Sequence, residues 1–351
     1  MTIDTAFALA GLGGFNAHGA GFLQAALDNR YRPDLITATS GQILVLANYL
    51  AGKKNLRDGL IQPGLASDPF AQLQTALFGY KGVFRPAFRE AYMNLLAPPS
   101  FSDSLIDIFS DRLFPAQQYV PSRPDYVIED VVGVLNSSDI GAVFNAYDPA
   151  SGTGVLYGND VARDHIKKES SIPIPPKDRP TDVRYAPEGK TEDEILPITA
   201  ESIKSALWLS LYGFDGLPGG RMDGAYHRSC IVSELHSFSR VIVVRPLANG
   251  WLKSRLPRSW FDVQDWQCEM WFSVGYKAEV DAMKRINQLL RDGYILDNNN
   301  PKKFKIVDLL EVEPTTPAGY FNYFVEREAV FEASRVESDA LFKRLNSQSS
   351  G

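Results

Sequence analysis

The N-terminal fifty residues alternate between short apolar runs and longer segments whose apolar residues recur at helical spacing. This pattern predicts strands at 5–10 and 34–38, helices at 17–27 and 41–50, and a glycine-rich turn at 11–14. The order strand, helix, strand, helix is typical of a βαβα unit, in which each helix carries the chain back so that the strands lie parallel. We therefore expect an α/β fold with a mainly parallel central sheet.

The middle of the chain contains three segments with different sequence patterns. Residues 69–113 show amphipathic helical patterns rich in phenylalanine, which indicate a cap over the domain or additional core. Two β-rich runs at 141–148 and 154–160, separated by a turn containing proline, serine and glycine, predict a hairpin. The proline-rich, polar segment 173–197 is expected to cross the surface as an extended loop.

Beyond this loop the pattern predicts a helix at 199–209 and a buried strand at 240–245. We expect the core sheet to end at that strand. Further helices are predicted around 278–290 and from 324 to 345, and the terminal NSQSSG is expected to be disordered. On these grounds the chain divides into a main domain, residues 1–247, and a C-terminal extension packed on it, residues 248–351.

Composition and charge narrow the class of protein. The chain has 351 residues, 44% of them hydrophobic and 22% charged, which is typical of a folded globular protein. With 36 basic and 42 acidic residues, the formal charge is −6. An excess of negative charge opposes binding to the phosphate backbone of nucleic acids or to a strongly anionic membrane. We therefore expect no nucleic-acid partner.

The number and spacing of the cysteines and the length of the apolar runs indicate the cellular compartment. Cys230 and Cys268 are the only cysteines, and neither lies in a metal-ligand spacing, so we expect neither a disulfide framework nor a structural zinc site. The N-terminus lacks the basic residue of a signal peptide, and no apolar run approaches the roughly 18 to 20 residues that span a bilayer. We expect a cytoplasmic protein whose membrane contact, if any, is peripheral.

Three motifs carry candidate chemistry. The glycine-rich GLGGFNAHG at 11–19 lies between a predicted strand and helix, where its N–H groups can hold an anion. Ser40, within ATSGQ, falls on the sharp turn between the second strand and the second helix, as in a nucleophile elbow. Asp223, within MDGA, follows a helix and a glycine-rich turn, where its carboxylate can act as a base.

This ordered set resembles the patatin-like lipid acyl hydrolase family, over roughly residues 5 to 245. The resemblance implies a three-layer α/β/α fold and a Ser–Asp dyad in which Ser40 is the nucleophile and Asp223 the base. It also implies an oxyanion hole, for which Gly13, Gly14 and Gly41 are the candidates. The implied activity is that of a phospholipase A, lysophospholipase or carboxylesterase acting on an acyl ester lipid, without a metal or organic cofactor.

The sequence departs from the family pattern at two places. The elbow has Ala38 and Gln42 where the family has glycine, and the loop has Phe15 where the family has a basic residue and Asn16 where it has the last glycine. Gln42 either points away along its helix or enters the site. These departures leave a second hypothesis open, in which the chain is a catalytically degenerate patatin-like protein that binds lipid or protein.

Simpler interpretations exist for each motif. Ser40 could be a helix N-cap, and Asp223 an ordinary turn residue before glycine. The glycine loop does not fit a dinucleotide fingerprint, because Asn16 occupies the position of the third glycine. A Ser–Asp–His triad would use His227 or His236, which both follow Asp223 in the chain. His227 follows Asp223 by only four residues and is more readily a structural polar group.

Overall fold

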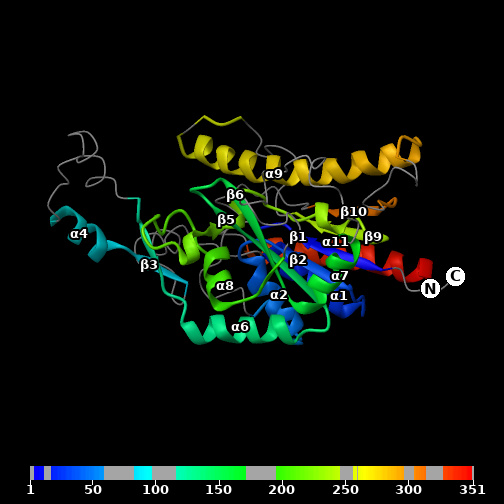
Figure 1. Cartoon of the computed structure of the whole chain (residues 1–351), viewed down its shortest axis with the longest axis horizontal. Helices are drawn as coiled ribbons and strands as arrows, with labels where there is room; N and C mark the ends of the chain where they lie inside the picture. Colours follow the sequence, from blue (N-terminus) through cyan, green and yellow to red (C-terminus); the bar gives the residue numbers. More distant parts are fainter. Residues whose placement is uncertain are drawn as a thin grey trace.

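The protein is represented by a computed structural model that describes residues 4–11, 17–58, 83–96, 116–170, 195–245, 256–258, 260–295, 304–313 and 327–349. Within these residues, eight strands form the main sheet in the order β10-β9-β1-β2-β5-β6-β7, with β8 paired to β5 (Figure 1). Their bounds are β1 Thr5–Leu9, β2 Leu35–Ala38, β5 Gly141–Asp148, β6 Thr153–Gly158, β7 Leu196–Pro197, β8 Met222–Asp223, β9 Arg240–Val244 and β10 Asp308–Val312.

The sheet is mainly parallel, as the sequence pattern predicts. Strands β10, β9, β1, β2 and β5 run parallel to one another, whereas β6 returns antiparallel beside β5 and forms the predicted hairpin. Strand β7 is parallel to β6. A separate two-stranded sheet, β3 Phe84–Pro86 with β4 Tyr119–Pro121, leads into α4 Phe88–Leu96, which projects from the body (Figure 1).

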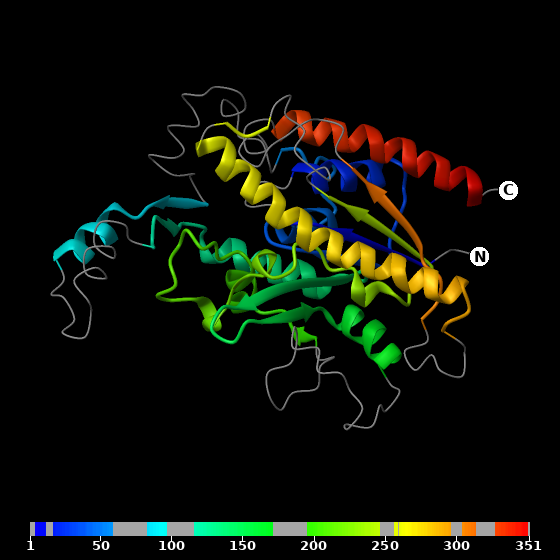
Figure 2. The ribbon, with the colours of Figure 1, turned by 90° about the horizontal axis from the view of Figure 1, so that it is seen from above.

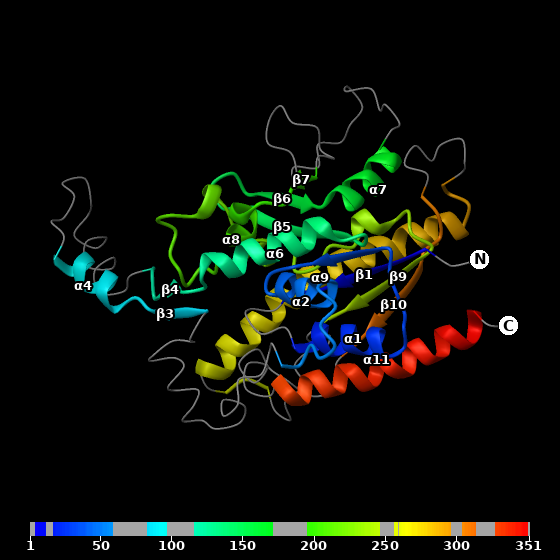
Figure 3. The ribbon, with the colours of Figure 1, turned by 90° about the horizontal axis from the view of Figure 1, so that it is seen from below.

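Helices cover both faces of the main sheet. Figure 3 shows α11, α1, α2 and α6 side by side across one face, with α8 next to α6, whereas α9 crosses the opposite face in Figure 2. Helix α7 contributes to the α9 side through buried Ala162. The bounds are α1 Ala17–Asp28, α2 Gln42–Leu50, α6 Asp125–Ser137, α7 Asp160–Ser170, α8 Ala200–Ala206, α9 Trp260–Arg291 and α11 Arg327–Ser349. The fold is a three-layer α/β/α arrangement.

Side-chain alternation along the strands explains the three layers. In β1, Phe7 and Leu9 belong to the core beneath α1 and α11, whereas Ala6 and Ala8 belong to the core beneath α9. Successive side chains of a strand point to opposite faces, so a strand buried on both faces is mostly apolar along its whole length. The five residues of β1 and of β9 are accordingly all buried.

The sheet does not end at β9, and that expectation is wrong. Strand β10 pairs parallel with β9 from Asp308 opposite Arg240 to Val312 opposite Val244. Its sequence, DLLEV, carries an acidic residue at either side of its leucines, because an edge strand is only partly buried. The division at residue 247 stays a prediction, although residues from both sides of it share one sheet.

Several element bounds also differ from the expectation. The predicted helix 199–209 ends at Ala206, and the helix predicted around 278–290 is the C-terminal part of the longer α9. Helix α11 continues through Ser349, so the expected disorder of the terminal segment is wrong for residues 346–349. Most of the predicted cap at 69–113 and of the loop at 173–197 lies outside the described residues.

Candidate active site

Ser40 occupies a tight turn between β2 and α2. Its backbone has a φ of +59°, in the left-handed region. The turn is closed by hydrogen bonds from Gln42 N–H to Thr39 O (3.2 Å) and from Ile43 N–H to Ser40 O (3.0 Å). A residue with a Cβ is strained in this conformation by roughly 1 to 2 kcal/mol, and such strain concentrates at functional sites. The N-cap of α2 is Gly41 and not Ser40, and no side-chain hydrogen bond caps the helix there.

Asp223 reaches the same place through strand pairing. Strand β2 pairs with β5 up to Ala38 opposite Phe144, and β8 pairs with β5 at Ala146 opposite Asp223. The other edge of β5 is occupied at Ala146 by Val155 of β6, so β8 must lie on the β2 edge. Strand β8 thus continues where β2 stops. Asp223 therefore lies beside the carboxyl end of β2, where the Ser40 turn begins.

The two side chains form a buried pair. Ser40 Oγ donates a hydrogen bond to Asp223 Oδ2, and Asp223 Oδ1 accepts one from Ala225 N–H at 2.8 Å. Each residue of the pair is 1% exposed. Burial raises the pKa of Asp223 to about 7, outweighing the hydrogen bonds from Ser40 and Ala225 that lower it. A carboxylate whose pKa lies near neutral pH is suited to take a proton and return it.

The arrangement excludes a histidine between the pair. A triad requires an imidazole that accepts the serine proton and donates to the carboxylate. Here the hydroxyl meets the carboxylate directly. The ring of His227 instead stacks on Tyr147, with centroids 5.5 Å apart and planes at 9°. The geometry therefore favours a dyad over a triad.

One candidate oxyanion donor falls within the described residues. Gly41 is the N-cap of α2, and among the described residues its N–H has no hydrogen-bond acceptor. An N–H at a helix N-terminus is oriented to stabilise negative charge. Gly13 and Gly14, the other two candidates, lie outside the described residues, as do Phe15 and Asn16. The start of their loop is fixed by Gly11 N–H, which donates to Ser229 O at 2.7 Å.

The Gln42 side chain contacts α1, the neighbouring helix. Its amide nitrogen lies 2.9 Å from His18 Nε2, and a Cβ placed on Gly19 would lie 2.1 Å from Gln42 Oε1. Gly19 thus leaves the space that Gln42 fills. The bulky residue in the elbow is accommodated by a glycine in the facing helix, and the hydrogen bond between Ser40 and Asp223 is made beside it.

His18 has a structural environment. It is 1% exposed, and its Nε2 lies 2.9 Å from Ala10 O. Burial lowers the pKa of His18 to about 3, more than the hydrogen bond to Ala10 raises it. The imidazole is therefore neutral at physiological pH. Its contact with Ala10 joins the two ends of the glycine-rich segment.

Asn145 is a site residue that sequence reasoning missed. Its Nδ2 donates to Gly224 O at 3.2 Å and to Arg228 O at 2.9 Å, so it holds the residues that follow Asp223. A Cβ placed on Gly224 would lie 2.3 Å from Asn145 Cγ, which explains the glycine after the aspartate. The available signal was a single amide within the apolar strand GAVFNAYD.

The chain matches no protein-family model and no curated protein. Within the described ranges, no group of three or more His, Cys, Asp or Glu side chains is placed to hold a metal ion. In the same part of the chain, no helix has both the length and the apolar composition needed to cross a membrane.

Proposed function

We propose that the protein is a serine acyl hydrolase that cleaves carboxylic esters with a Ser40–Asp223 dyad. Ser40 Oγ attacks the ester carbonyl carbon while its proton passes to Asp223. The tetrahedral intermediate collapses, and the leaving alkoxide takes that proton. Water then attacks the acyl-enzyme, again giving a proton to Asp223, and Ser40 recovers it as the acid leaves. The Gly41 N–H is assigned to the oxyanion, together with Gly13 and Gly14.

One observation carries the proposal: a serine in a left-handed turn donates directly to a buried carboxylate that comes from a distant part of the chain. A helix N-cap or a turn aspartate would require neither the strained backbone nor the loss of carboxylate solvation. The order of the three motifs is similar to that of the patatin-like family, from which the substrate class is taken. That class is an acyl ester lipid, such as a phospholipid or lysophospholipid.

A fluorophosphonate probe tests the proposal without knowledge of the natural substrate. The probe phosphonylates an activated serine, and the adduct is mapped by mass spectrometry. We expect labelling of Ser40 in the wild type and its loss in Asp223→Asn, with Ser40→Ala as the site control. His227→Ala should label at the wild-type rate. A folded wild-type protein that is not labelled would refute the hydrolase assignment.

The burial of both dyad residues favours one alternative, a catalytically inactive relative that binds lipid or protein. A substrate must reach Ser40 Oγ, and Ser40 and Asp223 are each only 1% exposed. The same experiment separates the two hypotheses. A binder would leave Ser40 unlabelled while retaining its fold.

We further propose peripheral contact with a lipid surface. Helix α9 exposes 40% of Trp266, 54% of Trp271 and 39% of Met270. The Trp271 ring lies 5.4 Å from that of Tyr226, three residues after Asp223. This apolar face is therefore next to the loop at residues 224–235, which we call the dyad loop. Tryptophan favours membrane interfaces. Flotation with neutral phosphatidylcholine vesicles should be reduced in Trp266→Ser.

Cys230 is free and buried, which suits the reducing cytoplasm proposed as the compartment.

A further inference from the structure

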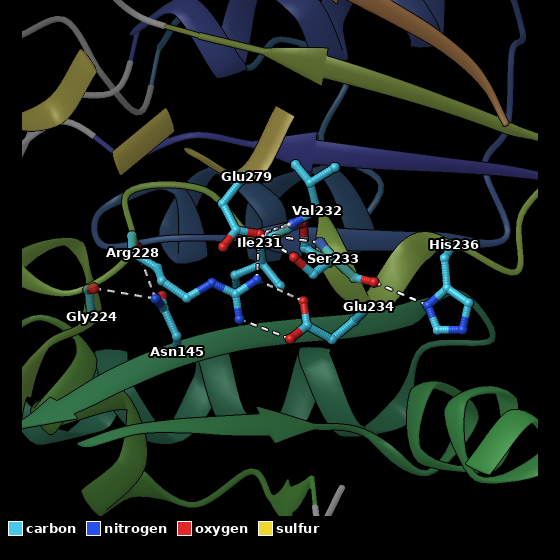
Figure 4. A network of polar contacts seen from close by, with 10 residues as sticks. Asn145, Gly224, Arg228, Ile231, Val232, Ser233, Glu234, His236 and Glu279 are labelled. Atoms are coloured by element: carbon cyan, nitrogen blue, oxygen red, sulfur yellow. Dashed lines mark hydrogen bonds and ion pairs between the residues drawn. The ribbon is translucent and has the colours of Figure 1, made fainter. Parts of the chain in front are cut away.

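The loop that follows Asp223 is attached to the sheet on one side. Asn145 in β5 donates to the carbonyl oxygens of Gly224 and Arg228, as Figure 4 shows. Strand β5 also pairs with β8, which ends at Asp223. These contacts fix the first part of the loop. Farther along the loop the sheet makes one more side-chain contact, from Thr37 Oγ1 in β2 to Ile231 O at 2.8 Å, and the residues from there to Leu235 are held from elsewhere.

The second attachment comes from α9, far along the chain. Glu279 Oε2 accepts hydrogen bonds from Val232 N–H at 3.3 Å, Ser233 N–H at 3.1 Å and Ser233 Oγ at 2.9 Å. Arg228 Nη2 lies 2.5 Å from the same oxygen (Figure 4). Glu279 is 4% exposed. One carboxylate of the C-terminal segment therefore gathers four donors from the loop that begins at Asp223.

Arg228 connects the two attachments. Its backbone carbonyl is held by Asn145, while its guanidinium forms two parallel bonds of 2.8 Å to Glu234 and a third to Glu279. Burial lowers the pKa of Arg228, but Glu234 and Glu279 outweigh it, so the net shift is upward and the charge is retained. Buried ion networks seldom stabilise a fold more than apolar packing would. In some proteins such networks instead fix one conformation of the segments that they join.

We propose that Glu279 is a positioning residue for the dyad, which holds residues 224–235 so that the Asp223 carboxylate meets Ser40 Oγ. This inference rests on the proposed function, because it assigns Glu279 to that same site. The catalytic unit then extends beyond residue 247. Helix α9 supplies a charge without which the dyad loop loses four of its hydrogen-bonding contacts.

The chain offers a matched control in Glu311. This carboxylate also anchors α9, through Tyr276 OH and Lys284 Nζ at 2.5 Å each, but it attaches the helix to β10 and not to the dyad loop. Loss of Glu311 weakens the docking of α9 on β10, whereas loss of Glu279 removes four of the hydrogen-bonding contacts between α9 and residues 224–235. The comparison separates a positioning role from a general structural one.

The experiment measures the rate constant for fluorophosphonate labelling of Ser40 as a function of pH, in full-length wild type and in Glu279→Ala, Glu279→Gln and Glu311→Ala. Circular dichroism gives the folded fraction of each variant. We expect labelling of Glu279→Ala to be about 100-fold slower, the typical effect of misplacing a reacting group by about 1 Å. Glu279→Gln keeps an acceptor oxygen and should recover part of the rate. Glu311→Ala should stay within about threefold of wild type.

The pH profile distinguishes misplacement from partial unfolding. When the dyad loop loosens, water reaches Asp223 and its pKa falls from about 7, so the midpoint of the labelling profile moves to lower pH. A smaller folded fraction would reduce the labelling amplitude and leave the midpoint unchanged.

Two outcomes overturn the inference alone, given a labelled wild type: wild-type rates in Glu279→Ala, or equal losses in the Glu279 and Glu311 variants with an unmoved midpoint. If Glu279→Ala does not fold, Glu279→Gln decides by its midpoint. Failure to label the folded wild type refutes the proposed function instead, and with it the role assigned to Glu279.

Discussion

Replacing Asp223 by asparagine should remove an electrostatic strain that grows with pH. Burial raises the pKa of this carboxyl from its ordinary value of 3.8 to about 7. The protonated form is therefore favoured in the folded protein, and stability is fully present below pH 3.8 and is lost as the pH rises through about 7. Each pKa unit corresponds to about 1.4 kcal/mol, so the ionised carboxylate destabilises the fold by roughly 4 kcal/mol. Asparagine carries no charge and can still accept from Ala225 N–H.

The assay is urea unfolding of wild type and Asp223→Asn at pH 5 and pH 8. Other carboxylates titrate in both proteins, so their effects cancel in the difference between the two free energies of unfolding. Since part of the loss has already occurred at pH 5, we expect this difference to grow in favour of the variant by roughly 2 to 3 kcal/mol by pH 8. Asp215→Asn, at an exposed position, is the control. An equal difference at both pH values would refute the inference that burial raises the pKa of Asp223.

Three further predictions concern the backbone and packing around the site. The free energy of unfolding of Ser40→Gly should be about 1 kcal/mol higher than that of Ser40→Ala, because both variants lack the hydroxyl and only glycine is unstrained at a φ of +59°. Equal free energies of unfolding would argue against a strained backbone at Ser40. Gly19→Ala should lower the free energy of unfolding by about 1 to 3 kcal/mol, and Gln42→Ala in the same chain should recover most of it, because the three atoms nearest to the added Cβ all belong to the Gln42 side chain. Additive effects would show that the two side chains do not share that space. Gly21→Ala places a Cβ 2.2 Å from Phe331 O, a backbone atom that cannot rotate away, so α11 must shift. The free energy of unfolding should fall by about 2 kcal/mol or more. An unchanged unfolding midpoint would show that α11 does not pack this closely on Gly21.

Local sequence patterns determined the elements near the N-terminus and the hairpin. The predicted strands and helices of the first fifty residues agree with β1, α1, β2 and α2 to within a residue or two at their ends. Periodicity is a local property, and these elements bury their apolar residues in the regular way that periodicity reports. The sequence pattern did not predict β10, because an edge strand with acidic residues lacks a continuous apolar run.

The sequence also singled out Ser40 and Asp223 as candidates, but only the tertiary structure decided how they relate. They are separated by 183 positions, and their contact depends on β8 taking up the edge of β5 where β2 ends. The direction of Gln42 depended likewise on the absence of a side chain at Gly19 in a different helix. Glu279 gave no signal in its own segment, because its role exists only when α9 lies against the loop after Asp223. Periodicity and turn residues specify which elements form, whereas contacts between distant segments specify the chemistry of the site.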